Sequence, residues 1–161
     1  MNKNNVVRAL IDRVEAQKEE IEKSLREAQA SIIDAPGPMQ SHSDTTRYQK
    51  AILAGSAASS LREKTLALSA LHQILALDAG KYIDKVQVGT LVTLLDEEDV
   101  MENYIIVPHC GGISVEEGIE SIVSITPESP LASELLGKAR GQSVTFSASG
   151  NFRVRTIFDL Y

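Results

Sequence analysis

Two long apolar stripes separated by a proline-glycine turn constrain this chain more than any other feature. The spacing alternates between three and four residues in both stripes. The first comprises Ile11, Val14, Lys18, Ile21, Leu25, Ala28 and Ile32, with Lys18 as a charged interruption, and the second comprises Ala54, Ala58, Leu61, Thr65, Leu68, His72 and Leu75. Residues 36–38 read Pro-Gly-Pro, which cannot continue a helix. This pattern predicts an antiparallel coiled-coil hairpin of two helices, each of about 28 residues and roughly 42 Å.

The ends of these helices can also be placed. We expect the first helix to stop near Ile33, before the prolines. Ser43 is the expected N-terminal cap of the second helix, followed by a first-turn acid at Asp44, with Ser41 as the alternative cap. The stripes themselves are expected to be packing surfaces.

Composition changes near residue 80. Residues 1–80 carry ten Lys/Arg and ten Asp/Glu, whereas the remainder carries six against twelve, so the whole net charge of -6 lies there. All three Phe and seven of the ten Gly also fall in the second part. We therefore expect an α+β chain, with a helical hairpin domain at 1–79 and a small antiparallel β domain at 80–161.

The second part alternates turn signals with short β-favouring runs. The expected strands are 86–95, 104–107, 119–125, 143–146 and 151–158, with an acidic turn at 96–99. One short helix is expected at 130–136, with Ser129 as its cap, Pro130 in its first turn and Gly137 at its end.

Charge and cysteine content exclude several classes of protein. A net charge of -6 argues against independent binding of duplex DNA, which needs clustered cations. No apolar run approaches the roughly 20 residues that span a bilayer, and no secretory signal is visible. The single cysteine, Cys110, suits a reducing compartment, so a cytoplasmic protein is expected.

No self-contained catalytic or metal site is evident. His109 and Cys110 are adjacent, which does not suit zinc, and we leave their role open. Gly111-Gly112 is expected to be a turn. The remaining candidates lie on the loop joining the two long helices: Ser41, His42, Ser43, Asp44 and Thr45. A carboxylate at the end of a rigid rod can deliver a metal ligand into another protein, although Asp44 can also simply cap the second helix.

Residues 125–144, ITPESPLASELLGKARGQSV, closely resemble the C-terminal signature of the bacterial transcript-cleavage factors GreA and GreB. Residues 88–92, VGTLV, resemble the first strand of the same domain, and residues 43–48, SDTTRY, resemble the family's hairpin tip. The resemblance covers essentially the whole chain. It is specific over residues 125–144 and looser in the hairpin.

The resemblance implies an FKBP-like C-terminal domain at the mouth of the RNA polymerase secondary channel and a coiled coil reaching the polymerase active centre. There, two acidic tip residues help to hold a second Mg²⁺, and the polymerase hydrolyses its own backtracked RNA. The factor would then be an accessory protein with no cofactor of its own, and Mg²⁺ would be shared with the polymerase. The segment implied to approach the polymerase contains Ser129, Pro130, Leu131, Gly137 and Lys138.

This chain departs from the family at the tip. The first acidic position is occupied by Ser41 and the second by the shorter Asp44. We therefore expect a polymerase-binding regulator of elongation with weak or no stimulation of cleavage. The alternatives are a fully active cleavage factor that uses Asp44, a peptidyl-prolyl isomerase and a plain coiled-coil adaptor. Because the hairpin can satisfy its own stripes, a monomer is expected.

Overall fold

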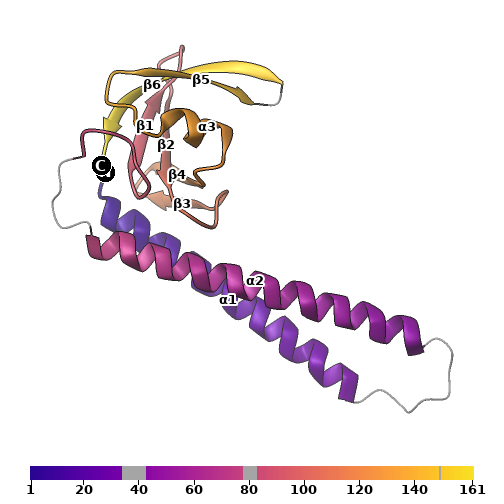
Figure 1. Cartoon of the computed structure of the whole chain (residues 1–161). Helices are drawn as coiled ribbons and strands as arrows, with labels where there is room; N and C mark the ends of the chain where they lie inside the picture. Colours follow the sequence, from indigo (N-terminus) through magenta and orange to yellow (C-terminus); the bar gives the residue numbers. More distant parts are fainter. Residues whose placement is uncertain (34–42, 78–82, 149) are drawn as a thin grey trace.

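A computed structural model describes residues 1–33, 43–77, 83–148 and 150–161, with side chains described outside 28–51 and 148. Two long helices form a finger that extends away from a β-sheet at the other end of the molecule (Figure 1). Within the described ranges, no helix is both long and apolar enough to cross a membrane.

The helical hairpin is confirmed. α1 (Lys3–Ile33) has 31 residues and α2 (Ser43–Leu77) has 35. At a rise of 1.5 Å per residue, they are about 46 Å and about 52 Å long. The predicted end near Ile33 agrees with the structure, and α2 begins at Ser43, the residue expected to cap it. The capping role of Ser43 stays a prediction. The two helices lie side by side and separate gradually toward the tip of the finger (Figure 1).

The predicted packing stripe of α2 is wrong in part. Ala58, Thr65 and His72 are exposed, whereas Ala67 and Leu71 are buried. The face directed at α1 is therefore rotated relative to the predicted stripe. The predicted stripe placed the polar residues Thr65 and His72 at packing positions. The observed face contains Ala67 and Leu71, which also belong to the hydrophobic cluster of the sheet domain. On α1, Ile11 and Val14 are buried as predicted.

The β domain contains six strands and one short helix, which confirms the α+β class. The elements are β1 (Leu91–Leu95), β2 (Met101–Ile106), β3 (Ser114–Glu117), β4 (Glu120–Ile125), α3 (Pro130–Leu135), β5 (Ser143–Ala148) and β6 (Asn151–Leu160). The strand order is β3-β4-β2-β1-β6-β5. The predicted turn at 96–99 joins β1 to β2.

The sheet differs from the prediction in two respects. β2 and β4 pair in parallel, because the unpredicted strand β3 adds one reversal of the chain between them. Its sequence, Ser-Val-Glu-Glu, contains a single apolar residue and so gave little signal. The first predicted strand also starts later, at Leu91. The residues before it form a turn, in which the N–H of Thr90 donates to the carbonyl of Gln87 and Gly89 has a φ of 90°.

Both faces of the sheet are covered by apolar packing. Neighbouring strand residues point to opposite faces, so Leu91 and Ile105 face the long helices while Val92 and Ile106 face α3. On the first face, Val7 and other residues of α1 join the same cluster as the strands. The finger and the sheet therefore share a hydrophobic core. The division of the chain at residues 79 and 80 stays a prediction.

Candidate functional site

The segment around α3 is built by a capped helix start, as the sequence predicts. Ser129 has extended backbone angles, and its Oγ accepts a hydrogen bond from the backbone N–H of Ala132 at 3.2 Å. Pro130 occupies the first turn, where a missing N–H costs nothing. Ser133 Oγ donates to the carbonyl of Pro130 at 3.0 Å. The start of α3 is therefore fixed by local hydrogen bonds that leave the Pro130 ring exposed.

The other end of α3 is hydrogen-bonded to the segment that precedes β1. Gly137 has a φ of 80°, a conformation that favours glycine, and its N–H donates to the carbonyl of Val86 at 2.8 Å. In return, the N–H of Val86 donates to the carbonyl of Lys138 at 2.8 Å. The Lys138 N–H donates to the carbonyl of Leu135 at 3.0 Å. The backbone holds this turn without help from the Lys138 side chain.

Burial divides the predicted contact residues into two groups. Leu131 and Leu135 are buried against the sheet with Ala132. Leu131 therefore positions α3 and offers no surface of its own. Pro130 and Gly137 are exposed, and Ser129 and Lys138 are half-buried. The structure brings these four residues to the two ends of one short helix.

The second set of predicted residues belongs to the tip of the finger. Ser41 and His42 lie outside the described residues, while Ser43, Asp44 and Thr45 form the first turn of α2, without described side chains. Between Ala35 and Arg47 the only carboxylate in the sequence is that of Asp44.

A single carboxylate does not make a divalent-metal site by itself, since hard cations take several oxygen ligands. Among the residues with described positions, no three His, Cys, Asp or Glu side chains come together as a metal site would require.

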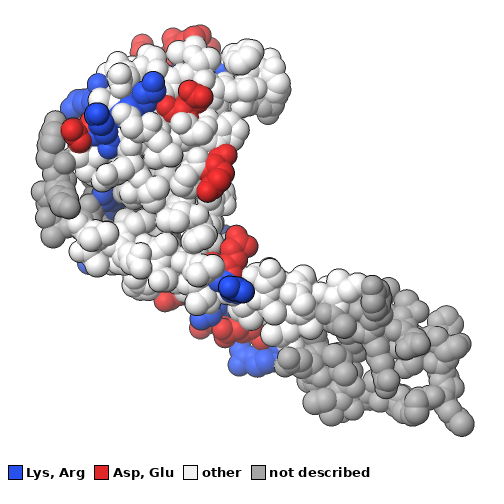
Figure 2. Space-filling model, in the orientation of Figure 1, with Lys and Arg blue, Asp and Glu red and all other residues white. Residues whose placement is uncertain are grey.

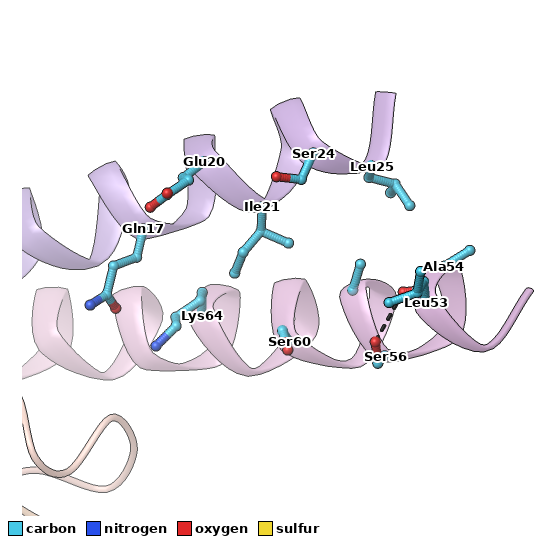
Figure 3. A pocket seen from close by; sticks show the side chains of 11 residues that line it. Gln17, Glu20, Ile21, Ser24, Leu25, Leu53, Ala54, Ser56, Ser60 and Lys64 are labelled. Carbon is cyan, nitrogen blue, oxygen red and sulfur yellow. Dashed lines mark hydrogen bonds between the residues drawn. The ribbon is translucent and has the colours of Figure 1, made fainter. Parts of the chain in front are cut away.

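A groove separates the two helices halfway along the finger (Figure 3). Its volume is about 600 Å³, and its apolar lining includes Ile21 and Leu25 of α1 and small residues of α2 such as Ala54 and Ala57. Because those small side chains cannot fill the space, the helices are less tightly packed here than near the sheet.

The junction of finger and sheet contains a carboxylate that sequence reasoning missed. Glu117 of β3 accepts the backbone N–H of Asn2 at 2.9 Å and the side-chain amide of Asn5 at 3.2 Å. It thus caps the N-terminus of α1 from 115 residues away, where a negative charge is favourable. The sequence gives no signal for this contact, because nothing local relates Asn2 to Glu117.

A second contact across the junction involves the lone cysteine. Lys64 Nζ of α2 lies 3.7 Å from Cys110 Sγ. Cys110 is buried and has a φ of 60°, and its carbonyl accepts a bond from Ser124 Oγ. Burial raises the pKa of the Cys110 thiol, while the Lys64 ammonium opposes that rise. The thiol is therefore part of the packing between α2 and the loop after β2.

Comparison with known proteins assigns the sheet domain. The family model described as "Transcription elongation factor, GreA/GreB, C-term" matches residues 80–159. This range contains α3 and all six strands apart from Leu160, the last residue of β6. No curated protein matches the sequence.

Solved structures of GreA-factor homologues are also similar to this chain. Gfh1 of Thermus thermophilus is 16% identical, with 94% of each chain covered and a TM-score of 0.38. Gfh1 of Thermus aquaticus is 16% identical, with 96% of this chain and 95% of that chain covered and a TM-score of 0.39. By this match, the sheet domain belongs to the GreA/GreB family of transcription elongation factors.

Proposed function

We propose that this protein binds RNA polymerase at its secondary channel and regulates elongation, with weak or no stimulation of transcript cleavage. One observation carries the proposal: a GreA/GreB domain at residues 80–159 holds a helical finger about 50 Å long through a shared core. A finger fixed in this way can reach into a channel when the sheet domain sits at its mouth.

The sheet domain offers a surface for that role at α3. Pro130 and Gly137 are exposed at the two ends of this helix, and the Lys138 side chain can be directed at an acidic partner without disturbing the backbone bonds that hold its turn. The net charge of -6 fits a protein partner better than direct contact with nucleic acid.

The tip sets the expected activity. Ser41 is neutral at any physiological pH, so Asp44 alone would bring negative charge to the polymerase active centre. Asp44 would contribute one ligand to Mg²⁺ shared with the polymerase, whose chemistry is two-metal phosphodiester hydrolysis. One carboxylate gives less charge than two. The chain's own residues then position the tip, and the polymerase carries out any hydrolysis.

The test separates channel occupancy from cleavage. The protein is added to backtracked elongation complexes, alone and in competition with a two-acid Gre factor from the same source as the polymerase. We expect it to inhibit cleavage by the competing factor while releasing little RNA itself. Failure to bind the polymerase where the competing factor binds would disprove the proposed function.

A charge-restoring variant tests the role of the tip. Ser41→Asp combined with Asp44→Glu is expected to raise cleavage by at least tenfold, about 1.4 kcal/mol in the barrier. Ser41→Asn with Asp44→Gln is the matched control of similar size without the charge. Robust cleavage by the unaltered protein, abolished by Asp44→Ala, would instead identify a fully active cleavage factor.

A further inference from the structure

The two edges of the sheet are protected very differently. β3 is four residues long, carries Glu116 and Glu117 and is approached by the N-terminus of α1 through Asn2. β5 is six residues long and, among the described elements, pairs only with β6. The segment 142–151, QSVTFSASGN, contains neither a charged residue nor a proline. Natural sheets block free edges with charges, prolines or short strands, and β5 has none of these.

The register of the β5–β6 hairpin identifies the backbone groups that point outward. Ile157 donates to the carbonyl of Gln142 at 2.9 Å, so Gln142 faces β6. In an antiparallel ladder, alternate residues bond to the same neighbour. The N–H and C=O groups of Ser143, Thr145 and Ser147 therefore point away from β6, toward the free side. Water can hydrogen-bond to these groups one at a time, whereas another extended strand can pair with the whole row.

We infer that β5 pairs antiparallel with β5 of a second copy of this chain, about a twofold axis at Thr145. In that register Thr145 lies opposite its own counterpart, and Ser143 lies opposite the partner's Ser147. Val144 lies opposite the partner's Phe146. Hydroxyl pairs and aromatic–β-branched pairs are both favourable neighbours across strands. The strand is thus complementary to itself, and its outward-pointing backbone groups form the hydrogen-bonded pairs of the new ladder.

The absence of charge favours a second copy over a foreign strand. A symmetric pair places like residues together, so a charged residue near Thr145 would meet its own kind. The hairpin projects beyond the rest of the sheet (Figure 1), and the face of its projecting end seen in Figure 2 is largely uncharged. Phe152 and Val154 lie on the same face as Thr145, and Phe152 is 82% exposed. A second copy can therefore reach the edge, with apolar surface beside it.

This inference does not rest on the proposed function, and it revises the expected monomer. That expectation considered the helical hairpin, which satisfies its own stripes, and not the edge of the sheet. One pair of six-residue strands makes an interface smaller than those of stable dimers, so the association should be weak and concentration-dependent.

Sedimentation velocity of the full chain tests the association. From low micromolar to several hundred micromolar protein, we expect the weight-average sedimentation coefficient to rise toward that of a dimer. Thr145→Lys places two like charges at the axis and should abolish the rise. Ser121→Lys, at an exposed position of the interior strand β4, is the matched control and should dimerise normally. A wild type that stays monomeric throughout, or a dimer indifferent to Thr145→Lys, overturns the inference.

Cysteine cross-linking tests the register. In a Cys110→Ala background, Thr145→Cys places two Cα atoms about 5.5 Å apart, within the range of a disulfide. Ser143→Cys is the control, because its two copies would be separated by about 14 Å. We expect mild oxidation to cross-link Thr145→Cys alone, and Ser143→Cys to cross-link only when mixed with Ser147→Cys. Equal cross-linking of both single variants, or binding of an added extended peptide by a monomeric wild type, contradicts pairing with a second copy.

Discussion

At the scale of single residues, Asp96 controls the tight turn between β1 and β2. Its Oδ1 accepts the backbone N–H of Val100 and that of Glu98, each at 2.8 Å. The bond from Val100, the bond from Glu98 and the nearby Arg155 guanidinium together lower the pKa of Asp96, against the opposing effect of desolvation. Because the folded pKa is depressed, the ionised side chain stabilises the fold above its ordinary pKa, and this contribution is lost as the pH falls through the folded pKa.

We therefore expect Asp96→Asn to flatten the acid limb of the stability curve. Urea unfolding between about pH 5 and about pH 2 should show a smaller loss of unfolding free energy in the variant than in the wild type. Asp84→Asn, which removes an exposed carboxylate before the sheet, is the matched control for the change in net charge. A variant slope equal to that of the wild type would show that the Asp96 charge does not contribute.

Sequence reasoning identified residues whose role is local. Ser129 and Gly137 were predicted correctly because a helix cap and a helix end depend on neighbours within a few positions. Glu117 and Lys64 were missed because their partners, Asn2 and Cys110, are remote in sequence. In the sequence, Lys64 looks like an ordinary exposed charge on a helix, because only the fold brings the Cys110 thiol next to it. The roles of Ser41 and Asp44 stay a prediction.

At the scale of elements, α3 and the turn after it contain different residues for packing onto the sheet and for the proposed contact with the polymerase. Leu135 is fully buried, whereas the Lys138 side chain has no part in the backbone bonds that fix its turn. We expect Lys138→Glu to weaken polymerase binding by several-fold while changing the unfolding free energy by no more than about 0.5 kcal/mol. Arg153→Glu, an exposed charge reversal on β6, is the control in the same binding assay. Unchanged binding by Lys138→Glu would remove this turn from the contact surface.

The same scale shows which elements a sequence can predict. The long helices and α3 were predicted because each carries strong periodic or capping signals along one continuous segment. β3 was not predicted, since Ser114–Glu117 offers one apolar residue and is stabilised by pairing with β4. The seam of α2 was misplaced because the sheet domain, and not only α1, determines which of its residues are buried.

At the scale of the whole molecule, the finger is an extension of the sheet's own core. One hydrophobic cluster buries Val6, Val7 and Leu10 of α1 together with strand residues such as Leu91 and Ile105. The Glu117 cap and the Lys64–Cys110 contact join the same two parts. Unfolding either part would expose the apolar residues that both parts bury. The base of the finger and the sheet should therefore unfold as one cooperative unit.

Leu10→Ala tests that cooperativity. Leu10 is 1% exposed in the shared core, and its truncation should lower the unfolding free energy by about 2–5 kcal/mol. In native-state hydrogen exchange, the most protected amides of both α1 and β2 should lose the same amount of protection. Leu66→Ala makes the same chemical change at a residue of α2 that is 48% exposed, and its effect should stay within about 0.5 kcal/mol. If Leu10→Ala reduces protection in α1 and leaves β2 unchanged, the two parts unfold separately, and the finger is held to the sheet only loosely.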